Sequence, residues 1–86
     1  MKVTRKQVNN VFIQFVKSIN GEVAQSYNDV DKYELDHNDQ GYQIVQITNA
    51  QGGQHQPFGG CRYKPSQIID LMQFSIKAIE VSKHGN

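Results

Sequence analysis

Residues 33–48, YELDHNDQGYQIVQIT, decide the fold of this chain. Tyr33, Leu35 and His37 alternate with acidic residues, which is the period of two typical of a strand with one buried face. The letters NDQG that follow combine polar turn residues with a glycine suited to positive φ. The second half of the stretch is rich in strand-forming residues on both faces, as in the central strand of a sheet. We therefore expect an antiparallel hairpin here.

A helix is predicted before the hairpin, over residues 5–19. Thr4 and Gln7 have the form of a capping box at its start, and Asn20 with Gly21 supplies a left-handed stop at its end. Residues between this stop and the hairpin show no period and predict a connection. The apolar positions of the helix fall on a single stripe: Val8, Val11, Phe12, Phe15, Val16 and Ile19.

Residues 49–64, NAQGGQHQPFGGCRYK, follow the hairpin. They predict a second turn, then a short third strand over residues 54–58, which Pro57 confines to the edge of the sheet. The glycine pair at 52–53 closes the turn, and the pair at 59–60 lets the chain leave the sheet and double back.

The last helix is expected to begin near Pro65, with Ser66 as its cap, and to run to about residue 82. Its polar positions form one narrow stripe, so the remaining surface offers about two apolar faces. One face would pack on the sheet and the first helix, and the other would meet a second chain. The homo-oligomer interface predicted on this helix consists of Ile69, Phe74 and Ile76.

The element order is thus a helix, a three-stranded antiparallel meander and a second helix. This order predicts an α+β fold, a two-layer sandwich, in a single domain covering residues 1–86. A chain of this size has a thin core, and partner chains often add stability, which again favours an oligomer.

Composition excludes some function classes. Hydrophobic residues make up 37% and charged residues 20%, and both fractions are low for a globular chain. The chain is correspondingly rich in amides, with eleven glutamines and seven asparagines. A net charge of +1 argues against general nucleic-acid binding. The charges are unevenly spread, however, and residues 22–39 are acidic. They form either an ordinary solvated surface or an acidic face for a basic partner: Asp29, Asp31, Glu34, Asp36 and Asp39.

No motif in the chain predicts catalysis or a metal site. Cys61 stands alone, so no intramolecular disulfide can form, and no local pattern ties a histidine base to it. Strand alternation places Asp36 on the opposite face from His37, which disfavours a metal site there. The carboxylates of Glu34 and Asp36 share a strand face but read as solvated. We expect a protein that is not an enzyme and needs no cofactor.

The chain begins without the apolar segment of a signal peptide, and no run approaches the ~20 apolar residues of a membrane span. The expected location is therefore the cytosol, with no membrane partner.

The glycine-rich segment is the candidate binding site. Arg62 and Lys64 precede the start of a helix, where N–H groups and the dipole favour anions. The backbone of Gly59 and Gly60 allows close approach of a ligand. Flat faces for stacking come from His55, Phe58 and Tyr63.

This combination favours a phosphate-bearing ligand such as a nucleotide. The alternative is that the glycines serve turns alone. The segment matches neither a P-loop nor a dinucleotide fingerprint.

The stretch from Tyr33 to Phe74 resembles a set of small uncharacterised proteins encoded by phages and prophages of Gram-positive bacteria. The resemblance lies in an aromatic-x-Leu-Asp strand, a Gly-Tyr second strand, a Gly-Gly turn and a Pro-Phe-Gly segment followed by an Arg. The matching positions are Tyr33, Leu35, Asp36, Gly41, Tyr42, Gly52, Gly53, Pro57, Phe58, Gly59 and Arg62. The resemblance implies a phage accessory setting in the host cytosol.

Three functions remain open in that setting. The first is an oligomer that sequesters a host defence signalling nucleotide, an anti-defence role, with Arg62, Lys64 and aromatic rings in a pocket between chains. The second is an inhibitor that binds a host defence protein through the acidic face, as anti-CRISPR proteins do. The third is a small structural or regulatory interaction module.

Overall fold

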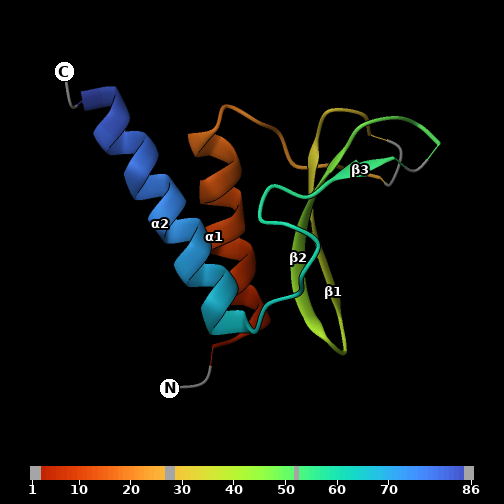
Figure 1. The fold of residues 1–86 in the computed structure, drawn as a ribbon, viewed down its shortest axis with the longest axis horizontal. Coiled ribbons are helices and arrows are strands. Elements are labelled where there is room, and N and C mark those ends of the chain that lie inside the picture. Colours follow the sequence, from red (N-terminus) through yellow and green to blue (C-terminus); the bar gives the residue numbers. More distant parts are fainter. Residues whose placement is uncertain (1–2, 27–28, 52, 85–86) are drawn as a thin grey trace.

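The computed structural model describes residues 3–26, 29–51 and 53–84. It confirms the predicted α+β order of a helix, three antiparallel strands and a helix (Figure 1). Gly52, the first glycine of the predicted second turn, lies outside the described residues. The elements are α1 (Arg5–Ser18), β1 (Tyr33–Asn38), β2 (Gly41–Ile47), β3 (Gln54–His55) and α2 (Pro65–His84).

Both predicted caps of α1 are present. The Thr4 hydroxyl accepts from the Gln7 N–H at 3.2 Å, and the Gln7 side chain accepts from the Thr4 N–H at 2.7 Å. At the other end Asn20 takes a left-handed φ of 58°. The N–H groups of Asn20 and Gly21 then donate to Lys17 and Val16 carbonyls, which is a Schellman motif.

The hairpin of β1 and β2 has the predicted turn. His37 lies opposite Tyr42 and Asn38 opposite Gly41. The Asn38 side chain accepts from the Gln40 N–H at 2.8 Å, and Gly41 has a φ of 128° that only glycine adopts readily. The strand order β1-β2-β3 confirms β2 as the central strand.

The third strand is shorter than predicted. It contains Gln54 and His55 alone, because the chain turns at Pro57, where the Gly59 N–H donates to the Gln56 carbonyl at 3.0 Å. Phe58, expected at the strand's end, instead packs its ring 5.3 Å from that of Phe15 in the core.

Tyr63 then takes the place beside β2 that the third strand leaves free. Its N–H donates to the Tyr42 carbonyl at 2.8 Å, and its carbonyl accepts from the Tyr42 N–H at 2.8 Å. The backbones are so close that a Cβ on Gly41 would lie 2.5 Å from the Tyr63 oxygen. This contact anchors the glycine-rich crossing to the sheet.

The start of α2 corrects one prediction. The helix begins at Pro65, a residue favoured at the first helical position, so Ser66 lies within the first turn and is not the cap. The Gln67 side chain accepts from the Lys64 N–H at 3.0 Å, and this contact satisfies the helix start instead. At its other end α2 continues to His84, beyond the predicted end.

The two helices pack together and cover one face of the sheet. In Figure 1, α1 and α2 run in the same direction, and both begin at the end of the molecule where the β1–β2 turn lies. No helix in the part of the chain that the structure describes is long and apolar enough to cross a membrane. The main buried cluster consists of Val8, Phe12, Phe15, Val16, Tyr42, Ile44, Ile68 and Met72. Val45 and Ile47 of β2 are buried as well.

Candidate functional site

The side chain of Arg62, the central cation of the predicted loop site, is bound by other residues of the chain. Its guanidinium forms an ion pair with the Asp36 carboxylate, and it donates to the Gly41 carbonyl at 3.3 Å. Its side chain is 21% exposed. The charge of Arg62 is therefore already compensated inside the chain.

Two of the three ring residues of that loop, Phe58 and Tyr63, are also bound within the chain. Phe58 packs on Phe15, and the Tyr63 hydroxyl donates to the Phe58 carbonyl at 2.9 Å. Gly59 has a φ of 87°, as turn chemistry requires. The other residues of the predicted site are exposed around this turn: His55, Gly60 and Lys64.

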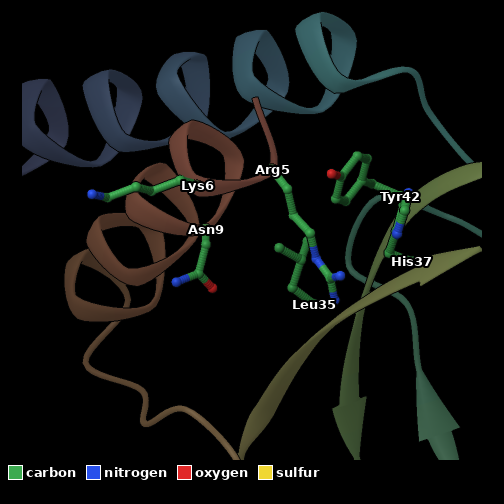
Figure 2. A pocket seen from close by; sticks show the side chains of 6 residues that line it. All are labelled: Arg5, Lys6, Asn9, Leu35, His37 and Tyr42. Carbon is green, nitrogen blue, oxygen red and sulfur yellow. The ribbon is translucent and has the colours of Figure 1, made fainter. Parts of the chain in front are cut away.

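A different part of the molecule forms a cleft, between the first turns of α1 and the hairpin. Its volume is about 410 Å³, within the range of small-molecule sites. Figure 2 shows Arg5 and Asn9 extending from α1 towards β1, while Lys6 extends along α1. The residues that line it are Arg5, Lys6, Asn9, Leu35, His37 and Tyr42.

Simple periodicities bring these side chains together. Arg5 and Asn9 are four residues apart, so they share one face of α1. Leu35 and His37 are two residues apart, so they share one face of β1. The register then places Tyr42 opposite His37. The cleft thus joins three elements that are not contiguous in the sequence.

One wall of the cleft is aromatic. The rings of His37 and Tyr42 are stacked, with centroids 4.4 Å apart and an interplanar angle of 27°. Tyr42 is 3% exposed, and its hydroxyl is turned towards α1 (Figure 2). That hydroxyl makes no hydrogen bond with any described residue. A nearly buried side chain of the cleft therefore ends in a polar atom that no described residue binds.

The charge of the cleft is positive. Neither Arg5 nor Lys6 has an ion pair with a described residue, and the first turn of α1 contains no acidic residue. The lining residues include no carboxylate. The amino end of α1 adds the positive end of its dipole. Chemically, the arrangement offers several hydrogen-bond donors to an anion beside a flat aromatic wall.

The predicted acidic face is partly neutralised within the chain. Lys32 lies 3.2 Å from Glu22 and 3.7 Å from Asp29, and Asp36 pairs with Arg62. The Glu22 carboxylate, which accepts from the Lys32 ammonium, and the nearby Asp29 charge raise the pKa of Lys32 above its usual value. The remaining members of the face have no ion pair within the described ranges: Asp31, Glu34 and Asp39.

The residues of the predicted oligomer interface are divided between two faces of α2. Ile69 and Ile76 are half-buried and pack against the core cluster. Phe74 is 76% exposed. Cys61 is a free, exposed thiol, and no group of three or more metal-ligating side chains occurs in residues 3–26, 29–51 and 53–84.

Sequence reasoning did not identify Arg5, Lys6, Asn9 or Tyr42 as site residues. One signal was available: α1 has two cations and no acid in its first turn, with Arg5 and Asn9 on one face. The facing strand residues carry no comparable signal, because His37 and Tyr42 read as ordinary members of a hairpin.

Comparisons of the chain with protein-family models, with curated proteins and with solved structures found no match.

Proposed function

We propose that this protein acts by binding an anionic small molecule that carries a flat ring, such as a nucleotide, in the cleft between α1 and the hairpin. The observation that carries the proposal is the Tyr42 hydroxyl, which makes no hydrogen bond with a described residue although its side chain is only 3% exposed. Arg5, which lines the same cleft, likewise has no ion pair among the described residues. Free donors around a cleft without carboxylates match the acceptors of a phosphate group.

Arg5 supplies the main attraction. A guanidinium presents a planar fork of N–H groups that binds phosphate or carboxylate oxygens in pairs. Figure 2 shows its side chain extending from α1 towards the hairpin, where Leu35 also lines the cleft. Lys6 adds a second, more mobile charge at the rim.

The aromatic wall supplies the part that recognises a ring. The His37 ring is exposed and is held in place by its stack on Tyr42. A base stacked on an aromatic side chain contributes on the order of 1–3 kcal/mol in single-strand nucleic-acid binders. Anion and ring would then be held at opposite sides of one cleft.

The lining residues support binding without turnover. They include no serine, cysteine, threonine or carboxylate, and the one imidazole, His37, is stacked on Tyr42. In the phage setting that the sequence resemblance implies, holding a host signalling nucleotide would by itself remove it from the host's defence.

The test uses native mass spectrometry on the purified protein before and after exposure to a nucleotide-rich bacterial extract. We expect a discrete added mass of an anionic compound on the wild-type chain. The mass should be lost in Arg5→Glu, since this variant places a carboxylate in the cleft. Lys17→Glu makes the same charge change in the last turn of the same helix, and it should retain the added mass.

A compound that binds Arg5→Glu as well as the wild type would contradict the proposed site. A wild-type protein that gains no mass, and that also fails to bind AMP, ATP and pyrophosphate by calorimetry, would contradict the proposed ligand class.

A further inference from the structure

The outer face of α2 carries the most exposed large apolar side chains of the described residues. Phe74 is 76% exposed and Val81 is 63% exposed. They lie on one side of the helix with Lys77 and Ala78, and these four residues line a shallow groove of about 360 Å³. A surface of this kind on a small protein marks an interaction site.

The spacing on this face is that of a helix–helix seam. Leu71, Phe74, Ala78 and Val81 follow one another at steps of three, four and three, which is the repeat that packs one helix against another. Leu71 is half-buried and also packs against the core cluster of its own chain. The opposite face of α2 is used inside the chain, where Ile68 and Met72 are fully buried. In Figure 1, α2 lies next to α1 at the outside of the molecule. It contacts β2, and its carboxyl-terminal part extends away from the sheet.

Charge complementarity identifies the occupant as a second copy of α2. Asp70 lies four residues before Phe74 and Lys77 three residues after it, on the same flank of the seam. When two such helices pair antiparallel about a two-fold axis near Phe74, Asp70 of each copy lies level with Lys77 of the other. Within one chain the two are seven residues, or about 10 Å, apart along the helix and cannot pair.

We infer that the protein forms a symmetric dimer through antiparallel α2 helices. Phe74 packs beside its own copy near the axis, Leu71 lies close to Ala78 of the second copy, and two Asp70–Lys77 ion pairs flank the apolar contact. The anion cleft lies between α1 and the hairpin, away from this face, so dimer formation and ligand binding are separate properties.

The test is sedimentation of the purified protein over a wide concentration range. One helix face buries less than the roughly 800 Å² per partner of a standard interface, so the dimer should dissociate on dilution. We expect a monomer–dimer equilibrium in the wild type. Phe74→Ser should abolish the dimer while leaving the circular dichroism spectrum of the monomer unchanged, because the side chain is exposed.

Two charge reversals identify the predicted pairing. Asp70→Lys and Lys77→Asp should each weaken the dimer by roughly tenfold or more, since like charges then face one another. An equimolar mixture of the two variants should form dimers again, because the heterodimer restores both ion pairs. Glu80→Lys is the control, as Glu80 lies away from the seam, and it should leave the equilibrium unchanged.

A chain that stays monomeric at all concentrations would overturn the inference. An oligomer that is unaffected by Phe74→Ser, or that the variant mixture fails to restore, would overturn it as well, since the contact would then lie elsewhere.

Discussion

Two arginines at the same end of this molecule differ in how their charges are used. Arg62 lies in the glycine-rich crossing, half-buried, with its guanidinium bound to Asp36 and to the Gly41 carbonyl. Arg5 lies in the first turn of α1 with no ion pair to a described residue, and its side chain lines a cleft. The first ties a loop to a sheet, whereas the second is available to a ligand.

The difference shows that a motif is an incomplete guide to a binding site. The glycines, rings and cations of the crossing looked like a ligand loop, yet most of them are satisfied by contacts within the chain. The cleft has no motif but holds unsatisfied donors. Burial and partners, which depend on the tertiary structure, separate the two regions.

The largest expected effect comes from Gly41, where the crossing meets the sheet. Gly41→Ala should destabilise the fold by about 3 kcal/mol or more, because φ is 128° and the new Cβ would lie 2.5 Å from the Tyr63 carbonyl oxygen. Urea unfolding measures the change. Gly60→Ala is the matched control: no atom lies within 4 Å of its Cβ position, so a comparable loss there would contradict the explanation.

Replacing the two arginines tests the comparison directly. Arg62→Ala should lower the free energy of unfolding by about 1–2 kcal/mol, because it leaves Asp36 and the Gly41 carbonyl without their partner. Arg5→Ala should change stability by no more than about 0.5 kcal/mol, as an exposed side chain without an ion pair. Equal losses in the two variants would show that the charge of Arg5 is also used by the fold.

Two tyrosine hydroxyls offer a finer comparison. Tyr42→Phe should leave stability nearly unchanged and weaken binding of the ligand found in the extract by on the order of 1 kcal/mol, since its hydroxyl is free to serve the ligand. Tyr63→Phe should lower stability and leave ligand binding nearly unchanged, because its hydroxyl donates to the Phe58 carbonyl. Calorimetric titration together with thermal unfolding separates the two outcomes. Loss of binding in Tyr63→Phe alone would return the site to the crossing.

The smallest effect is expected at Lys32, whose ion pair with Glu22 is more exposed than the Arg62–Asp36 pair. Its pKa in the folded protein is raised above the ordinary value of 10.5, chiefly by its hydrogen bond to Glu22. The resulting stability is therefore present below that pH and is lost as the pH rises through the folded-state pKa. The small difference in unfolding free energy between wild type and Lys32→Met should stay constant at lower pH and shrink as the pH rises above 10.5. A difference that stays constant would show that the ammonium charge does not contribute.

The fold was predictable where local signals agree. The capping box at Thr4, the left-handed Asn20 and the glycine at position 41 each specify the backbone within a few residues, and the structure confirms them. The short β3 and the start of α2 were predicted less well. From the sequence, Pro57 can lie within an edge strand or end it, and Pro65 can precede a helix or begin it. Packing of Phe58 on the core decides the outcome at Pro57.

The cleft was not predictable in the same way. Its members lie on α1, β1 and β2, and each is unremarkable in its own segment. Whether a cation is free depends on where the nearest carboxylate lies after folding. Arg62 finds Asp36, 26 positions earlier in the chain, while Arg5 finds none among the described residues.

The core is formed mainly by the two helices, with Val8 and Phe12 of α1 packed together with Ile68 and Met72 of α2. These partners are separated by more than half of the sequence, so most of the apolar burial requires closure of a long loop. The hairpin can form early from neighbouring residues, but until α2 arrives it has only α1 to pack against. We therefore expect a folding rate limited by helix docking, and a nascent chain that cannot complete its core until α2 has left the ribosome.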